Sequence, residues 1–177
     1  DYFQATRGGG NGDYRTVGPS PSNIQEAVDF VQEAFDIADQ YRNPCMVVFD
    51  GLIGQMMEPI EWHDIPKRNL PSKDTRATTG RKGRAVHNTL NSLYMDPETC
   101  DKHNEHLAEK FAEMEKNEVR WEEVQCEDAD LVIAAYGTPA RIALTALDTL
   151  RAEGIKAGLF RPITVWPFPE KALRDLI

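Results

Sequence analysis

Apolar side chains recur every three or four residues between positions 24 and 38, which is the spacing of one face of an α-helix. The positions on this predicted face are Ile24, Ala27, Val28, Val31, Phe35 and Ala38. Ser22 precedes the pattern and Gln25 follows it by three residues, as in a capping box. Asn43-Pro44 then interrupts the pattern, because proline lacks an N–H. We therefore predict a helix within residues 20–41, with Ser22 as its N-cap.

A short, continuous apolar run, Cys45 to Phe49, follows this helix. Such a run is typical of a parallel strand that is buried on both faces. Asp50-Gly51 comes directly after it and predicts a turn at the end of the strand. A helix followed by a buried strand is half of an α/β unit. We expect this first structural piece to end between Met57 and Trp62.

The last fifty residues repeat this architecture. ADLVIAAYGT predicts a buried strand, PARIALTALDTLRAEG predicts a helix, and IKAGLFRPI predicts a second strand, before WPFPEKAL begins another helix. Thr138 is the expected N-cap and Pro139 the first helical residue. The predicted apolar face of this helix consists of Ile142, Ala143, Ala146 and Leu150. The order predicts a right-handed βαβ unit, and ligands commonly bind at the carboxyl ends of such strands.

Residues 63–127 differ in character from both flanking parts. Residues 66–84 contain seven basic residues and one acidic residue, whereas residues 96–130 contain 13 acidic and 4 basic residues, a balance of −9. Asp96 and Pro97 predict the start of a helix with a thin apolar stripe of Leu107, Phe111 and Met114. The basic stretch has no interleaved aromatic residues, which favours a solvated linker over a nucleic-acid site. We predict an ordered connector between two domains.

Composition restricts the class of protein further. The chain has 177 residues, 41% of them hydrophobic, and no apolar run of the length that spans a bilayer. Its three cysteines lack a CxxC pair, which indicates a reducing compartment such as the cytoplasm and argues against an iron–sulfur cluster within this chain. The chain begins at Asp1 without a signal-peptide pattern, and PEKALRDLI resembles a helix that has only begun. We expect a piece of a longer protein.

The stretch TRGGGNGDYR, residues 6–15, is the most unusual candidate site. Glycine admits positive φ and permits close approach of a ligand or another chain, although a flexible turn would look the same. It is not a dinucleotide fingerprint, because Asp13 stands where the third glycine belongs, and no GK[ST] follows. Cys100, His103 and His106 recur every third residue, but this spacing spreads them over a helix surface, which favours surface residues over metal ligands. We identify no catalytic residue and no metal ligand in the chain.

Several motifs together resemble one family. GGGNGDYR, GQMMEP, AYGT and RPITVWPFP, with DYFQATR before them and TTGRKGR, NSLYMDPE and KHNEHL between them, resemble the α subunit of 2-oxoacid:ferredoxin oxidoreductases. The branched-chain, 2-ketoisovalerate type is the most similar. The resemblance runs along nearly the whole chain. It implies that residues 1–62 end a thiamine pyrimidine-binding domain, 63–127 form the connector, and 128–177 begin a transketolase C-terminal-like domain with a parallel sheet.

The resemblance also implies a function. The family oxidatively decarboxylates a 2-oxoacid, here 2-ketoisovalerate, to an acyl-CoA and passes electrons through iron–sulfur clusters to ferredoxin. It implies β and γ partner subunits, with thiamine diphosphate and Mg bound mainly by the β subunit and the clusters held by other chains. No contact with nucleic acid or a membrane is expected. A pyruvate or 2-oxoglutarate enzyme, or a non-catalytic assembly module, remains the alternative.

The resemblance also implies a position for residues 6–15, which we call the glycine loop. The family's substrate-binding arginine and the glutamate against the aminopyrimidine ring would lie before Asp1, so the chain alone is expected to be inactive. The loop is expected near the cofactor or the partner subunit, with Asp13 and Arg15 fixing it by pairing. Asn11 stands where the family usually has histidine. The candidate cofactor-binding residues are Gly8, Gly9, Gly10, Asn11, Asp13 and Arg15.

Overall fold

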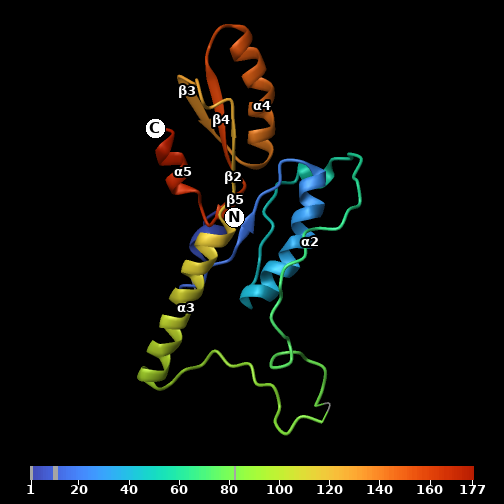
Figure 1. Ribbon diagram of the computed structural model, residues 1–177, viewed down its shortest axis with the longest axis vertical. Helices are drawn as coiled ribbons and strands as arrows, with labels where there is room; N and C mark the ends of the chain where they lie inside the picture. The colour runs from blue at the N-terminus through green and yellow to red at the C-terminus, as the bar shows by residue number, and fades with distance from the viewer. Residues whose placement is uncertain (1, 10–11, 82) are drawn as a thin grey trace.

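The computed structural model describes residues 2–9, 12–81 and 83–177 and has an α/β fold (Figure 1). Figure 1 shows a sheet with one covering helix at one end of the molecule and the two longest helices at the other. In chain order, the elements are α1 (Tyr2–Arg7), β1 (Gly18–Pro19), α2 (Ile24–Tyr41), the 3-10 helix η1 (Ile53–Gln55), α3 (Pro97–Glu118), β2 (Trp121–Val124), β3 (Leu131–Ala134), α4 (Gly137–Ala152), β4 (Ala157–Pro162), β5 (Thr164–Trp166) and α5 (Glu170–Asp175).

The predicted βαβ unit is confirmed as β3–α4–β4. Strand β3 pairs parallel with β4, so that Leu131 lies opposite Ala157. All of β4 is buried, because it is the central strand of the order β2-β4-β3. A core of Ala140, Ala143, Leu147, Ala157 and Leu159 joins α4 to this sheet. The predicted face of α4 is partly wrong, since Ile142 is 63% exposed and Leu147 takes its place in the core.

An antiparallel edge strand completes this sheet and was not predicted. Residues of β2 pair with β4, with Trp121 opposite Pro162 and Val124 opposite Leu159. The helical pattern of the acidic segment continues to Val124 in the sequence, but α3 ends at Glu118. Residues 121–124, at the end of the predicted connector, therefore hydrogen-bond to β4 and form part of the sheet β2-β4-β3. The domain boundaries at 62/63 and 127/128 remain predictions.

Helix α2 begins with a capping arrangement one residue later than predicted. Asn23, and not Ser22, is the N-cap, and its side chain accepts a hydrogen bond from the Glu26 N–H at 2.8 Å. The Glu26 carboxylate in turn accepts from the Ser22 N–H at 2.8 Å. The buried face of α2 also differs from the prediction. It consists of Phe30, Ile37 and Tyr41, whereas Phe35 is 73% exposed.

The apolar run Cys45–Phe49 is extended but is not a buried strand. Val17 and Cys45 form a single parallel bridge, and the Met46 and Val48 N–H groups donate to the carbonyls of Val17 and Pro19 at 2.8 and 2.9 Å. Phe49 is 48% exposed. The prediction of burial is therefore wrong within the described residues, where the run pairs along one edge.

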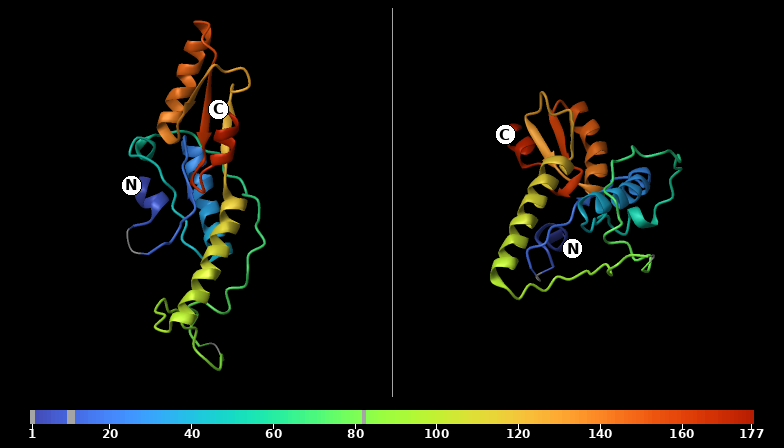
Figure 2. Two further views of the ribbon diagram at one scale, coloured as in Figure 1. Left: turned by 90° about the vertical axis from the view of Figure 1, so that its left-hand side faces the viewer. Right: turned by 60° about the horizontal axis from the view of Figure 1, so that its bottom comes forward.

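The described residues of the connector, 63–81 and 83–95, form no helix or strand before Asp96. That residue caps α3, with Pro97 at its first position, as predicted; the Asp96 carboxylate accepts from the Thr99 N–H at 2.8 Å. Met114 is fully buried and Phe111 packs beside it, against a cluster of Val17, Ile37, Tyr41 and Trp166. Figure 2 shows α3, coloured yellow-green to yellow, extending away from the sheet. The connector, in green, leads into the end of α3 that is farther from the sheet. None of the helices in the described part is both long and apolar enough to cross a bilayer.

Ion pairs join the sheet β2-β4-β3 to helix α2. Arg161 of β4 is 4% exposed and contacts the carboxylate of Glu26 at the start of α2, and it also contacts Glu122 at 3.1 Å. Arg120, just before β2, pairs with Glu33 of α2 at 2.7 Å. Because buried charges are costly unless they are paired, these contacts fix the two parts against each other.

Candidate functional site

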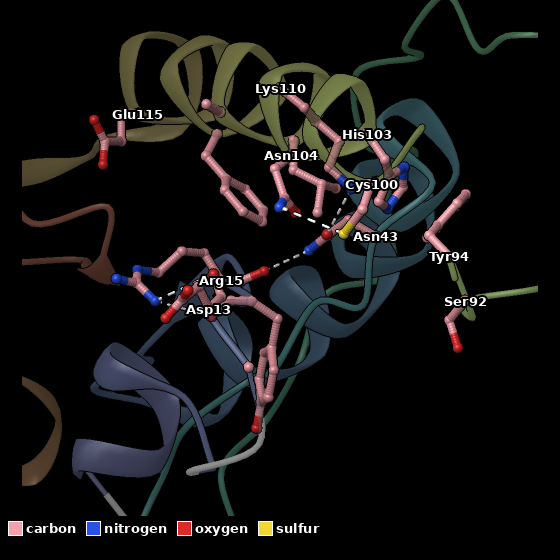
Figure 3. Close-up of a pocket in the computed structure, with 15 residues that line it drawn as sticks. Asp13, Arg15, Asn43, Ser92, Tyr94, Cys100, His103, Asn104, Lys110 and Glu115 are labelled. Carbon is pink, nitrogen blue, oxygen red and sulfur yellow. Dashed lines mark hydrogen bonds between the residues drawn. The ribbon is translucent and has the colours of Figure 1, made fainter. Parts of the chain in front are cut away.

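The glycine loop faces an open cleft of about 780 Å³ on one side of α3 (Figure 3). Figure 3 shows Asp13 and Arg15 on one wall, Cys100, His103 and Tyr94 on the other, and Asn43 between them. The lining comes from the loop, the end of α2, the connector and α3, and consists of Gly12, Asp13, Tyr14, Arg15, Asn43, Ser92, Tyr94, Cys100, His103, Asn104, Leu107, Ala108, Lys110, Phe111 and Glu115. A volume of this size is in the range of small-molecule and cofactor sites.

Two of the predicted glycines serve the packing of the loop itself. The Gly9 N–H donates to the Tyr14 hydroxyl at 2.5 Å, and a Cβ on Gly9 would meet the same hydroxyl oxygen at 2.5 Å. Gly8 has a φ of +80°, a conformation that favours glycine. Gly10 and Asn11 lie outside the described residues. Tyr14 was not predicted as a site residue, although its place within GDYR was visible.

The predicted pairing of Asp13 with Arg15 is wrong in its acceptor atom. The Arg15 guanidinium donates to the backbone carbonyls of Tyr14 at 3.1 Å and of Asp13 at 3.4 Å. Among residues 2–9, 12–81 and 83–177, the Asp13 carboxylate forms no ion pair. The loop is thus held by hydrogen bonds between its own side chains and its own backbone, and the Asp13 side chain stays exposed at the cleft.

Asn43 links the loop to α3. Its side-chain amide donates to the Arg15 carbonyl at 2.7 Å, and its oxygen accepts from the Lys110 ammonium at 3.0 Å. Burial, with a smaller contribution from the charge of Arg42, lowers the pKa of Lys110. The Lys110 ammonium also lies 5.4 Å from the centre of the Phe111 ring. In the sequence, Asn43 is recognisable only as a helix breaker, and no local signal points to a contact 67 residues away.

The three residues weighed as metal ligands separate in space. Cys100 and His103 line the cleft, but His106 does not. The His103 ring stacks on Tyr94, with ring centres 4.3 Å apart. In the part of the chain that is described, no three cysteine, histidine or acidic side chains gather closely enough to hold a metal ion.

A second cleft, of about 460 Å³, lies where β3 ends and α4 begins. The AYGT motif lines it, together with Ser20 and Asp50. Thr138 does not cap α4 as predicted: the helix begins at Gly137, and its N-cap, Tyr136, makes no capping bond with its side chain. Gly137 has a φ of +60°, so the chain turns into the helix one residue before Thr138.

Comparison with known proteins identifies both parts of the chain. Residues 1–125 match the family model described as "Pyruvate flavodoxin/ferredoxin oxidoreductase, thiamine diP-bdg". Residues 129–177 match "Pyruvate:ferredoxin oxidoreductase core domain II". A solved 2-oxoglutarate:ferredoxin oxidoreductase from Magnetococcus marinus superposes with a TM-score of 0.73 over 98% of this chain and 35% of that one, at 19% identity, and so shares the fold.

Curated relatives are similar along nearly the full chain. The ketoisovalerate oxidoreductase subunit VorB of Methanothermobacter marburgensis is 42% identical over 176 residues, which is 99% of this chain and 49% of the relative. The 2-oxoglutarate synthase subunit KorA of Methanocaldococcus jannaschii is 32% identical over 193 residues, 96% of this chain and 52% of the relative. The chain spans about half the length of these relatives. With one family model covering more than half of its residues, the chain belongs to the 2-oxoacid:ferredoxin oxidoreductase family.

Proposed function

We propose that the chain is part of a subunit of a thiamine-dependent enzyme that oxidatively decarboxylates a 2-oxoacid to an acyl-CoA and passes the electrons to ferredoxin. The family membership supports this reaction class, and the open cleft beside the glycine loop is the structural observation that carries it. The chain would act in the cytoplasm within a complex containing β and γ subunits. A reconstituted complex should reduce ferredoxin only when 2-oxoacid, coenzyme A and thiamine diphosphate are all present.

The proposed substrate is 2-ketoisovalerate. Identity to the VorB subunit, at 42%, exceeds identity to the KorA subunits, at 31–32%, and to a pyruvate synthase subunit PorA of Pyrococcus furiosus, at 30%. Rates with 2-ketoisovalerate, 2-oxoglutarate and pyruvate at equal concentration test the assignment. A higher kcat/KM for either of the last two would replace the substrate without removing the reaction class.

We propose that this chain supplies only part of the thiamine diphosphate site. When bound, this cofactor supplies the carbanion chemistry that decarboxylation of a 2-oxoacid requires. A diphosphate is commonly held through a divalent cation with oxygen ligands, and no group of three metal-ligating side chains is found in the described ranges. We therefore assign the diphosphate, Mg and the iron–sulfur clusters to partner subunits, and derive no step of the reaction from this chain.

The role proposed for the loop of Gly8, Gly9, Gly10, Asn11, Asp13 and Arg15 is to face the cofactor or the partner subunit. Gly9→Val cannot test it, because the added side chain would clash with the Tyr14 hydroxyl whatever the loop faces. Asp13→Ala is the better variant, since the Asp13 carboxylate has no ion-pair partner among the described residues and its loss should not alter the fold. Asp101→Ala, an exposed acid on α3, is the matched control.

The proposed role predicts a clear difference between these variants. In the reconstituted complex, Asp13→Ala should lower turnover or thiamine diphosphate affinity at least tenfold, and Asp101→Ala should leave both unchanged. Equal behaviour of the two variants would contradict a role of the loop at the cofactor. If the complex assembles but binds no thiamine diphosphate under any condition, the alternative of a non-catalytic assembly module is favoured.

A further inference from the structure

The cleft at the start of α4 combines parts of the chain that are far apart in sequence. Its lining comes from α1, from the residue after β1, from the extended run before Asp50, and from the β3–α4 turn. None of the residues lining it belongs to the glycine loop. At about 460 Å³, it has room for a small metabolite.

One end of this cleft presents hydrogen-bond donors for an anion. Helix α4 has 16 residues, no acidic residue in its first turn and no capping side chain. Pro139 has no N–H, so the Gly137 and Thr138 amides are those of the first turn that lack an intrahelical acceptor. The positive end of the helix dipole adds to their attraction for a carboxylate or phosphate.

One buried hydroxyl group beside the start of α4 lacks a partner. Ser20 is 1% exposed, and in the described part of the chain its side-chain oxygen makes no hydrogen bond. This oxygen lies beside the helix start, since a Cβ on Gly137 would be 3.5 Å from it. Thr138 is 6% exposed, and its hydroxyl lies close enough to the Asp50 carboxylate to affect the pKa of that group. Buried polar groups are normally paired, so a ligand oxygen here would give the Ser20 hydroxyl its partner.

An acidic side chain, Asp50, lies next to this helix start. One oxygen of the Asp50 carboxylate accepts from the Ile53 N–H at 3.0 Å. This bond, and secondly the nearby Thr138 hydroxyl, holds the pKa of Asp50 below its usual value, so the group is charged at neutral pH. Among the residues described, Asp50 forms no ion pair. A bare anion on the helix would be repelled by this carboxylate, whereas a ligand with a cation next to its anion would satisfy both the helix start and Asp50.

The remaining walls of the cleft are apolar. Val48, Phe49, Ala134 and Ala135 line them, and the Tyr2 ring stacks on Tyr136 with centres 5.9 Å apart. Phe49 is 48% exposed, so part of this apolar surface is accessible. Such walls select a ligand with a hydrocarbon side chain.

We propose that this cleft binds an α-amino acid with an apolar side chain. Its carboxylate would lie on the first-turn amides of α4 and the Ser20 hydroxyl, its ammonium on Asp50, and its side chain against the apolar walls. L-Valine is the probe of choice because it has the carbon skeleton of 2-ketoisovalerate. That link to the substrate rests on the proposed function, whereas the binding itself does not.

Isothermal titration calorimetry of the complete subunit in its complex tests the proposal. We expect saturable binding of L-valine, and at least tenfold weaker binding of isovalerate, which lacks the ammonium, of L-valinamide, which lacks the carboxylate, and of inorganic phosphate. Asp50→Asn and Ser20→Ala should each weaken L-valine binding at least tenfold. Asp148→Asn, which removes an exposed acid on α4, should not change it.

Several results would overturn the proposal. These are no saturable heat with L-valine, equal affinity for L-valine and either phosphate or isovalerate, or unchanged L-valine binding in both Asp50→Asn and Ser20→Ala. Ser20→Ala only removes an unpaired hydroxyl, so its fold should be retained even if Asp50→Asn misfolds. A complex that binds L-valine but oxidises none of the three 2-oxoacids would remove the proposed function and keep this site.

Discussion

Glu118 is the acid whose removal should destabilise the protein most clearly. It is 2% exposed at the end of α3, and its two carboxylate oxygens accept from the Arg68 guanidinium at 2.5 and 2.8 Å. The Tyr41 hydroxyl donates to it at 2.9 Å. This cluster joins the connector, α2 and α3. Glu118→Gln would place an amide N–H₂ where the Arg68 N–H groups now find an acceptor.

The magnitude follows from the burial of the pair. Breaking a fully buried ion pair costs about 3–5 kcal/mol, because one charge is left uncompensated. Arg68 has a side chain 26% exposed and can recover part of its hydration, so we expect Glu118→Gln to lower the free energy of unfolding by about 2 kcal/mol. For a unit of this size that corresponds to a melting temperature lower by about 4–8 °C.

Urea unfolding of the complete subunit, followed by circular dichroism at pH 7, measures this loss. Glu105→Gln, on the exposed face of α3, is the control and should remain within about 0.5 kcal/mol of the wild type. Replacing both partners, as in Arg68→Met with Glu118→Leu, should recover part of the loss because no unpaired charge remains. The reasoning is refuted if Glu118→Gln unfolds at the same urea concentration as the wild type.

The same pair gives the sign of a pH dependence. Burial raises the pKa of Glu118, but the hydrogen bonds from Arg68 and Tyr41 outweigh it, and the pKa is lowered overall. A carboxyl group with a lowered folded-state pKa stabilises the fold above its unfolded pKa of about 4.3 and loses this effect as pH falls through its folded value. The difference between wild type and Glu118→Gln should therefore be constant from pH 6 to 8 and shrink below about pH 4.

Two further predictions concern cysteine reactivity and backbone packing. Burial raises the pKa of Cys45 to about 11, so at pH 8 its thiolate fraction should be about 100-fold below that of an ordinary thiol. Mass spectrometry should therefore find Cys45 alkylated far more slowly in the folded than in the urea-unfolded subunit. Equal alkylation rates would contradict this. Gly158→Ala would bring a Cβ within 2.8 Å of the Gln125 carbonyl oxygen and should lower the free energy of unfolding in urea by about 1–3 kcal/mol. Gly51→Ala, with no atom within 4 Å of the added Cβ, should leave that free energy unchanged. Equal effects of the two variants would disprove the contact.

The α/β class and its longest elements could be predicted from local patterns. Asp96 and Pro97 mark the start of α3 unambiguously, because both the cap and the missing N–H act within one helical turn. Strand β2 could not be predicted in this way. Its residues Trp121–Val124 are half acidic and continue a helical pattern, and only their pairing with β4, almost 40 residues later, makes them a strand.

Which face of a helix is buried was harder to predict than the helix itself. Val31 and Phe35 belong to the apolar pattern of α2, yet they are exposed, and Tyr41 is buried because its hydroxyl reaches Glu118 on another helix. The same limit applies to the clefts. Arg15 was identified from its motif, but its contact with Asn43 joins two segments whose local patterns carry no information about each other.

The packing of the described glycines in residues 6–15 reduces the number of candidate site residues in this loop. Gly8 and Gly9 lie against Tyr14, so their lack of side chains is needed by the loop itself. Gly12 has a φ of +86° and nothing within 4 Å of its Cβ position, so it turns the chain where the surface stays open. Directly after this turn, Asp13 projects a carboxylate that the described residues leave unpaired. The hydrogen bonds within the loop do not use the Asp13 carboxylate, which therefore stays available for another contact. We expect a contact of the loop with a cofactor or partner to be detected first at Asp13.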